Sequence, residues 1–304
     1  MIRIVMFDLG ETLIDANRRP FPHVREALTA LAGFRTEDSS PLGSCLVSDD
    51  TMVPPPVTPD KIRPVFEEYI AVLDAAGLRE FFEPVDERVT LSTHVGVRKP
   101  DHAVFEMALH RLRSNATLQE CLFITENPEH IRAARQTLGM ATLQFRAPGA
   151  AGFDFDDWSK APALIANLVD PEQPDNLRGA VQAHLAAQGV ETVNAQAVNT
   201  SGKVQVTGQV WHKLSVPGYP DLGDLHVAVP VQGELTRGRK GDLAGKLPTQ
   251  IDKEQLDELG SYVRSLAAHG QIETGASKPA RATHAIETDD QGRRKLVRRR
   301  FNAV

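Results

Sequence analysis

The first 147 residues alternate short apolar runs with longer amphipathic runs. Short apolar runs are typical of strands buried on both faces, and apolar residues at helical spacing indicate helices that cover them. This order predicts an α/β domain with a parallel sheet. The predicted strands are Ile2–Phe7, Ser44–Val47, Arg88–Ser92, Leu122–Thr125 and Ala141–Phe145, and the predicted helices are His23–Ala32, Asp60–Ala76, Ala103–Leu112 and Pro128–Leu138.

The pattern changes in the second half of the chain. Trp158–Val169 predicts a closing helix, and the PEQPDN segment, residues 171–176, is typical of a linker. Strands in series with two helices then predict a small α+β domain with an antiparallel sheet at 177–304. Its predicted helices are Leu177–Gln188 and Lys253–Ala268, and its predicted strands are Thr192–Val198, Lys203–Leu214, Asp224–Leu235, Thr283–Thr288 and Arg294–Phe301, the last two joined by a turn at 289–292.

Composition agrees with two globular domains. The 304 residues are 41% hydrophobic and 24% charged, which provides cores and argues against a disordered chain. Net charge is −8 over residues 1–170 and +2 over residues 171–304, as expected of two different modules. No apolar run approaches the roughly 18 residues that span a bilayer, so we expect a cytoplasmic protein with no membrane partner. The two cysteines, Cys45 and Cys121, lie in apolar runs and are expected to be reduced core residues.

Polar residues with chemical potential follow the predicted strands. Asp8 follows the first strand in FDLGETLID, Ser48 and Asp49 follow the second, Lys99 lies in VRKPD, and Glu126 follows FIT. Ligands of open parallel sheets bind at the carboxyl ends of the strands, so these side chains should converge. A nucleophilic carboxylate, a hydroxyl, a lysine and a second acid suit phosphoryl transfer.

In that interpretation the two acids, Asp8 and Glu126, hold Mg²⁺, whose preferred ligands are oxygens. Lys99 neutralises charge on the nucleophile and on the phosphate, and Ser48 or Thr12 donates hydrogen bonds to phosphate oxygens.

The segments FDLGETL, LVSD, GVRKPDHAVFEMAL and FITENPEHIRAARQTLGM, in this order, resemble the four motifs of the haloacid dehalogenase (HAD) superfamily. Members have a Rossmann-like domain and form an aspartyl-enzyme intermediate. The resemblance covers about residues 1–147, with 170 as its outer limit. It implies the following roles: Asp8 as nucleophile, Thr12 and Ser48 as phosphate contacts, Lys99 as the charge-neutralising lysine, and Asp8, Glu126 and the backbone carbonyl of Gly10 as ligands of Mg²⁺.

The chain departs from the motifs at two places. Phosphatases of the superfamily usually carry a second aspartate, a general acid and base, where this chain has Gly10. General acid–base catalysis contributes about 10²–10⁴ in rate, so its loss slows hydrolysis unless a neighbour such as Glu11 substitutes. In the fourth motif Thr125–Glu126 replaces a glycine–aspartate pair, and Glu129 and His130 stand where a second aspartate commonly follows. The longer glutamate predicts weaker binding of Mg²⁺.

The spacing of the motifs also leaves no room for a full cap domain. Only 39 residues lie between Asp8 and Ser48, and about 50 separate Ser48 from Lys99. We therefore expect an essentially capless site that is open to a macromolecular substrate or is covered by the C-terminal domain or a partner.

Each candidate also has an ordinary structural interpretation. Asp8 suits a turn or a helix start, and Ser48 with the next two aspartates suits a helix N-terminus. Lys99 before a proline suits an exposed loop, and Glu126 with His130 suits an acidic turn. The basic run at 292–301 suits either a nucleic-acid contact or, more simply, an edge strand protected by its charges.

Two hypotheses follow. The first is a HAD-like, Mg²⁺-dependent phosphatase that acts through an aspartyl-phosphate intermediate on a phosphorylated small molecule or macromolecule. The second is a catalytically degenerate HAD domain that serves as a binding or scaffold module, while residues 177–304 bind a protein or, less simply, a nucleic acid. Gly10 and Glu126 favour the second hypothesis. The residues that favour the first are Asp8, Thr12, Ser48 and Lys99.

Overall fold

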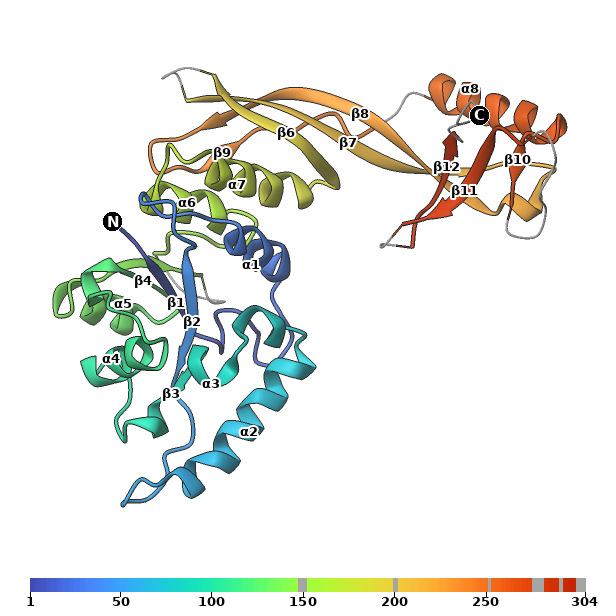
Figure 1. Cartoon of the computed structure of the whole chain (residues 1–304). Coiled ribbons are helices and arrows are strands. Elements are labelled where there is room, and N and C mark those ends of the chain that lie inside the picture. The colour runs from blue at the N-terminus through green and yellow to red at the C-terminus, as the bar shows by residue number, and fades with distance from the viewer. Residues whose placement is uncertain (147–151, 199–201, 251–252, 275–281, 290–291, 299–304) are drawn as a thin grey trace. The chain divides into compact units, whose positions relative to one another are not determined.

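The computed structural model describes residues 1–146, 152–198, 202–250, 253–274, 282–289 and 292–298. The chain forms two compact units, one made of residues 1–187, 195–204 and 235–245, and the other of residues 188–194, 205–234 and 246–304. The elements up to residue 187, all in the first unit (Figure 1), are β1 (Ile4–Phe7), α1 (Val24–Ala32), β2 (Gly43–Ser48), α2 (Pro59–Ala75), η1 (Arg79–Phe82), α3 (Val85–Arg88), β3 (Val89–Leu91), η2 (Ser92–His94), α4 (His102–Arg111), η3 (Leu118–Glu120), β4 (Cys121–Thr125), α5 (Pro128–Gln136), β5 (Ala141–Gln144), α6 (Ala161–Val169) and α7 (Pro174–Ala186).

The first unit is built on a five-stranded sheet in the order β3-β2-β1-β4-β5. Each strand is parallel to its neighbours, so all five carboxyl ends lie at one edge, and β1 is central. The α/β class and the predicted strands are therefore confirmed, with ends that shift by one or two residues.

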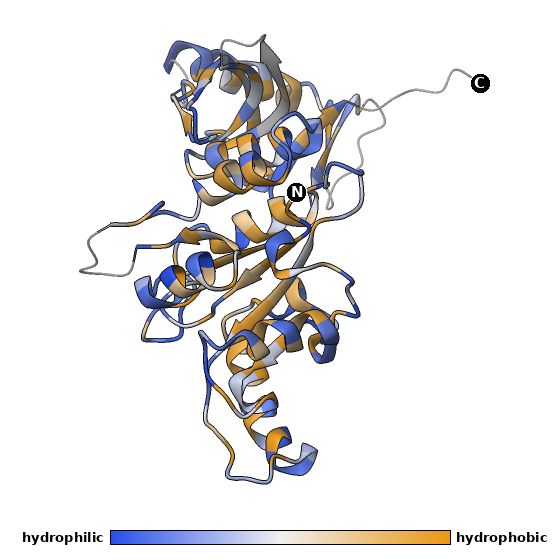
Figure 2. Cartoon of the chain, turned by 90° about the vertical axis from the view of Figure 1, so that its left-hand side faces the viewer, coloured by the Kyte–Doolittle hydropathy of each residue, from blue (hydrophilic) through white to orange (hydrophobic). Residues whose placement is uncertain are grey.

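Successive residues of β1 face opposite sides of the sheet, as the pleat requires. Val5 and Phe7 pack into a cluster with α1, α2 and α6, whereas Ile4 and Met6 pack with α4 and α5. Figure 2 shows the strands coloured as hydrophobic along their length. Burial on both faces explains why these strands have continuous apolar runs in the sequence.

The structure differs from the sequence-based boundary after residue 170. Helix α7 begins at Pro174, inside the predicted linker, and packs against α1 and α6. Asn176 is fully buried, and its side chain bonds to the backbone N–H and C=O of Arg35. A Cβ on Gly179 would lie 2.7 Å from the ring of Phe34, so a glycine is required at this close approach. Because α7 completes the first unit, the division into units does not coincide with residues 170 and 177.

The C-terminal region has two sheets where the sequence predicts one antiparallel sheet. One has the order β6-β7-β8-β9, and the other, β10-β11-β12, is mixed because β10 is parallel and β12 antiparallel to β11. The elements are β6 (Val190–Val198), β7 (Lys203–Ser215), η5 (Pro220–Leu222), β8 (Asp224–Arg237), β9 (Leu243–Ala244), α8 (Lys253–Ala268), β10 (Ile272–Glu273), β11 (His284–Thr288) and β12 (Arg294–Arg298).

In the second unit, α8 buries Val263 and Leu266 against Leu214, Leu225 and Ile272. Parts of the predicted turn at 289–292 and of the predicted strand Arg294–Phe301 lie outside the described residues. Among the helices of the described ranges, none combines the length and the apolar character that crossing a bilayer requires.

Candidate active site

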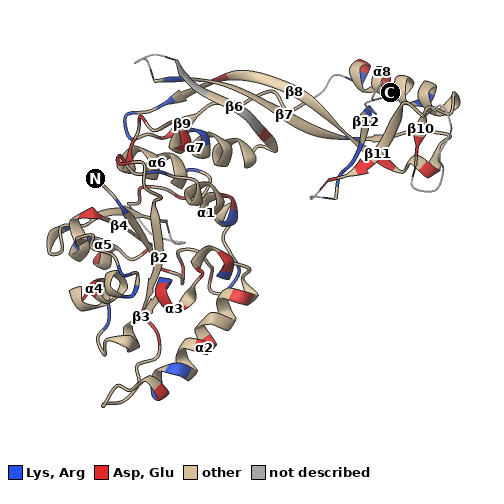
Figure 3. Cartoon of the chain, viewed as in Figure 1, with Lys and Arg blue, Asp and Glu red and all other residues tan. Residues whose placement is uncertain are grey.

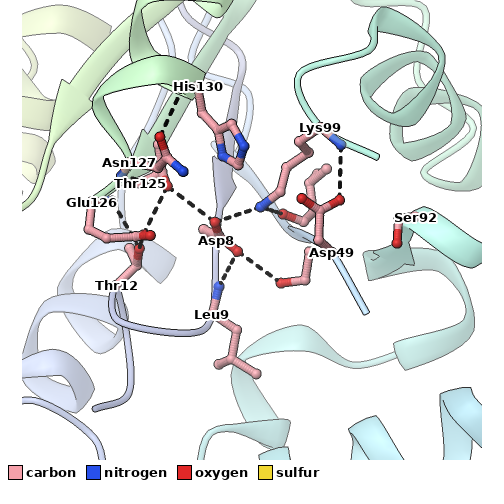
Figure 4. A network of polar contacts seen from close by, with 12 residues as sticks. Asp8, Leu9, Thr12, Asp49, Ser92, Lys99, Thr125, Glu126, Asn127 and His130 are labelled. Atoms are coloured by element: carbon pink, nitrogen blue, oxygen red, sulfur yellow. Dashed lines mark hydrogen bonds and ion pairs between the residues drawn. The ribbon is translucent and has the colours of Figure 1, made fainter. Parts of the chain in front are cut away.

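Asp8 lies directly after the central strand β1, at the carboxyl edge of the sheet. Its backbone N–H donates to the carbonyl of Ile124 on β4 at 2.9 Å, which continues the parallel ladder for one residue. Its Oδ1 accepts the N–H of Leu9 at 2.9 Å and the hydroxyl of Ser48 at 3.2 Å. The residue is 8% exposed, so its carboxylate is held almost entirely by the protein (Figure 4). The interpretation of Asp8 as a simple turn residue does not account for this burial.

Lys99 is the cation of the site. Its side chain is 1% exposed, and its Nζ lies 2.5 Å from Oδ2 of Asp8. Nζ also donates to the carbonyl of Val47 on β2 at 3.0 Å, and the Lys99 N–H donates to Oδ1 of Asp49 at 2.9 Å. The structure therefore excludes the interpretation of Lys99 as an exposed loop lysine. A buried ammonium needs a partner charge, and Asp8 provides it.

Ser48 is the last residue of β2 and is buried. The next helix, α2, begins only at Pro59, so the alternative of a helix N-terminus at residues 48–50 is wrong. The Ser48 Oγ accepts a hydrogen bond from the hydroxyl of Tyr69 on α2 at 2.7 Å. Ser48 therefore connects helix α2 to the Asp8 carboxylate.

Glu126 and Thr12 bond to each other across the site. The hydroxyl of Thr12 donates to Oε2 of Glu126 at 2.6 Å, and the N–H of Glu126 donates back to Thr12 Oγ1 at 3.1 Å. Thr12 also has a backbone role, because its carbonyl accepts the indole N–H of Trp158 at 2.9 Å. Trp158 is completely buried among Phe7, Phe145 and Phe155, so an aromatic cluster anchors the loop that carries Asp8 and Thr12.

Thr125, which stands where the fourth motif has a glycine, is a site residue to which the sequence assigned no role. Its hydroxyl lies 3.1 Å from Oδ2 of Asp8 and 3.0 Å from Oε2 of Glu126. A hydroxyl carries one proton, so Thr125 can donate to only one of these two carboxylates at a time. Its position at the end of a buried apolar strand and its place in the fourth motif are the sequence signals that could have indicated it.

His130 lies in the first turn of α5, and Figure 4 shows its ring turned toward Asp8 and Lys99. Asn127 caps this helix by accepting the N–H groups of Glu129 and His130. Burial, and then the charge of Lys99, hold the pKa of His130 below its usual value, so the imidazole is neutral at physiological pH. Its Nδ1 is buried and has no hydrogen-bond partner among the residues that the structure describes.

The position of Gly10 does not require a glycine. The residue is exposed, and a Cβ added there would have no heavy atom of the described residues within 4 Å. The structure thus brings Asp8, Thr12, Ser48, Lys99 and Glu126 together at one edge of the sheet, with Gly10 in the adjoining loop.

The oxygen donors of this site match the chemistry of Mg²⁺. Asp8, Asp49 and Glu126 provide three carboxylates near one ammonium, and among the described residues no basic side chain pairs with Glu126. The single proton of Thr125 between two carboxylates marks the same deficit of positive charge. Within the described ranges, no group of three or more His, Cys, Asp or Glu side chains has the arrangement of a metal site.

The basic run of the C-terminal region is partly neutralised within its own unit. Figure 3 shows Lys and Arg along β12. Just before this strand, Arg293 pairs with Asp289 and Glu191, and on the strand Lys295 pairs with Asp289. Both cations lie over the ring of Trp211, at 4.1 and 4.3 Å from its centroid. These contacts account for two of the basic residues as parts of the fold.

Comparison with known proteins gives structural similarities alone. No family model matches the chain, and no curated protein matches its sequence. An L-2-haloacid dehalogenase from Xanthobacter autotrophicus is 17% identical with a TM-score of 0.35, covering 56% of this chain and 83% of that one. A protein described as a predicted HAD-like family hydrolase from Porphyromonas gingivalis is 18% identical with a TM-score of 0.23, covering 49% and 93%. A HAD family enzyme from Bacteroides thetaiotaomicron, crystallised as an Asp-to-Ala mutant with magnesium and inorganic phosphate, is 13% identical with a TM-score of 0.22, covering 49% and 97%.

Proposed function

We propose that the chain is a hydrolase of phosphate monoesters that uses Asp8 as its nucleophile. The observation that carries the proposal is the buried Asp8 carboxylate at the carboxyl end of the central strand, 2.5 Å from the Lys99 ammonium. A carboxylate can attack phosphorus when its charge is balanced and its position is fixed, and both conditions hold here.

The proposed reaction has two steps. An Asp8 oxygen attacks phosphorus, the bond to the ester oxygen breaks, and that oxygen leaves with the electron pair and takes up a proton. Water then attacks the phosphorus of the aspartyl phosphate, the bond to Asp8 breaks, and inorganic phosphate is released with the carboxylate restored. Lys99 pairs with Asp8 between turnovers and offsets the negative charge that gathers in both transition states.

We include Mg²⁺ in this proposal because the site has more carboxylates than basic side chains, and an anionic phosphate ester would need further positive charge to bind there. Asp8, Glu126 and the backbone carbonyl of Gly10 would hold the ion. When bound, Mg²⁺ supplies positive charge against the phosphate oxygens. The hydroxyl of Thr12 orients the Glu126 carboxylate, and the hydroxyl of Thr125 lies within hydrogen-bond distance of both the Glu126 and the Asp8 carboxylates.

Gly10 predicts which substrates react. With no side chain there, the leaving oxygen has no donor from this position, so esters whose leaving group is already acidic are favoured. The neutral imidazole of His130 faces Asp8 and Lys99 (Figure 4), and it is the neighbouring group that we propose as proton acceptor for the attacking water.

The test is hydrolysis of 4-nitrophenyl phosphate by the purified protein across Mg²⁺, Mn²⁺, Co²⁺ and Zn²⁺, with Asp8→Asn as the matched variant. We expect activity that requires a divalent cation and disappears in Asp8→Asn. If both proteins release nitrophenolate at the same rate with every metal, Asp8 is not the nucleophile.

A second candidate function is binding without catalysis. The observation that favours it is that both oxygens of Asp8 already accept two hydrogen bonds or ion-pair contacts each. If wild type and Asp8→Asn are equally inert but bind inorganic phosphate in the presence of Mg²⁺, this function replaces the first.

A further inference from the structure

Tyr69 is a buried polar residue that the proposed reaction does not use. It lies on α2, is 6% exposed, and its ring packs in the same apolar cluster as Ile70 and Leu73. Its hydroxyl donates to Ser48 Oγ at 2.7 Å, and Ser48 Oγ donates to Oδ1 of Asp8 at 3.2 Å. A linear chain of hydrogen bonds therefore runs from helix α2 to the nucleophile.

The chemistry of the three groups fixes the direction of this chain. An ionised carboxylate has no proton, so it only accepts, and the single proton of Ser48 must point to Asp8. The remaining lone pairs of Ser48 can then only accept, and Tyr69 must be the donor. Burial holds the pKa of Tyr69 well above its usual value, so the phenol keeps its proton.

From this arrangement we infer that Tyr69 is a positioning residue, which acts through Ser48 to hold the Asp8 carboxylate in its attacking orientation. The inference rests on the proposed function, since it assigns a role in the same site. While these two hydrogen bonds are intact, the Ser48 proton is directed to Asp8 and is not available to a phosphate oxygen. Asp8 then has a fixed Oδ1, held by Leu9 and Ser48, opposite the Oδ2 that faces Lys99.

A role through Ser48 predicts a specific pattern in variants. Tyr69→Phe removes the donor and keeps the ring, so Ser48 becomes free to rotate. We expect kcat for 4-nitrophenyl phosphate to fall about fivefold to tenfold, the worth of one hydrogen bond, with KM unchanged. In a Ser48→Ala background the same substitution should have no effect on kcat, because the intermediate group is already missing.

Ile70→Val is the matched control. Ile70 is the adjacent buried residue of α2, and its side chain has no polar atom. The substitution should therefore lower the free energy of unfolding and leave kcat unchanged. If Tyr69→Phe lowers kcat equally in the wild-type and Ser48→Ala backgrounds, or does not lower it at all, Tyr69 does not position Asp8 through Ser48. Asp8 then remains the nucleophile. If the wild type and Asp8→Asn are equally inert, the proposed function fails and this role fails with it.

Discussion

The ion pair between Lys99 and Asp8 should dominate the stability of the first unit's sheet edge. The side chains are 1% and 12% exposed, so neither charge has much access to water. Removing one partner of a buried pair costs about 3–5 kcal/mol because an uncompensated charge remains. In Lys99→Met, Asp8 keeps three neutral donors, which places the expected loss near 3 kcal/mol. In Asp8→Asn, Lys99 loses its partner charge and keeps neutral contacts such as the carbonyl of Val47 and the ring of Phe123, so a similar loss is expected.

The double variant, Asp8→Asn with Lys99→Met, removes both charges of the pair. Its loss should therefore be smaller than the sum of the two single losses by at least about 2 kcal/mol. The assay is urea unfolding followed by the fluorescence of Trp158, which is buried in the first unit and bonded to the loop of the site. A Trp211→Phe background removes the other tryptophan of the chain, which lies in the second unit. A coupling within about 0.5 kcal/mol of zero would refute the buried pair.

Two further predictions concern proton transfer and pH. The space at Gly10 can hold an aspartate, which would supply an acid for the leaving oxygen. Gly10→Asp should therefore raise the rate of hydrolysis of an alkyl phosphate by about 10² or more, and that of an aryl phosphate much less. If the isosteric Gly10→Asn variant hydrolyses the alkyl phosphate as fast as Gly10→Asp, this reasoning is wrong. Burial, and then Arg111, lower the pKa of His94 to about 4, and its Nδ1 accepts the N–H of Leu91. The unfolded chain takes up this proton first, near pH 6.5, so stability should fall as the pH decreases from about 6.5 to about 4, by on the order of 1–2 kcal/mol after allowance for solvent screening. His94→Gln should remove this part of the urea-unfolding pH profile, and an unchanged profile would contradict the assignment.

Much of the first unit could be predicted from the sequence because its signals are local. The apolar runs at Ile4–Phe7 and Cys121–Thr125 are continuous because both faces of these strands are buried. Parallel strands align their carboxyl ends, and this rule alone placed Asp8, Ser48 and Glu126 at one edge. By contrast, α7 was assigned to the wrong side of a boundary because Pro171 and Pro174 resemble a linker, while the burial of Asn176 is a tertiary fact.

The hydrogen-bond partners within the site were beyond the sequence. Thr12 and Ser48 were expected to face the phosphate, and in the structure their hydroxyls are bonded to Glu126 and Asp8. Thr125 and Tyr69 look like ordinary core positions of a strand and a helix. Their roles depend on which oxygen lies within 3 Å after packing.

By itself, the sequence determined which chemical groups lie at the carboxyl edge of the sheet, because periodicity and strand ends are properties of neighbouring residues. Only the tertiary structure decided which of these groups share protons and charge. Segments more than 100 residues apart, such as Thr12 and Glu126, meet there, and a hydrogen bond depends on tenths of an ångström that no local pattern encodes.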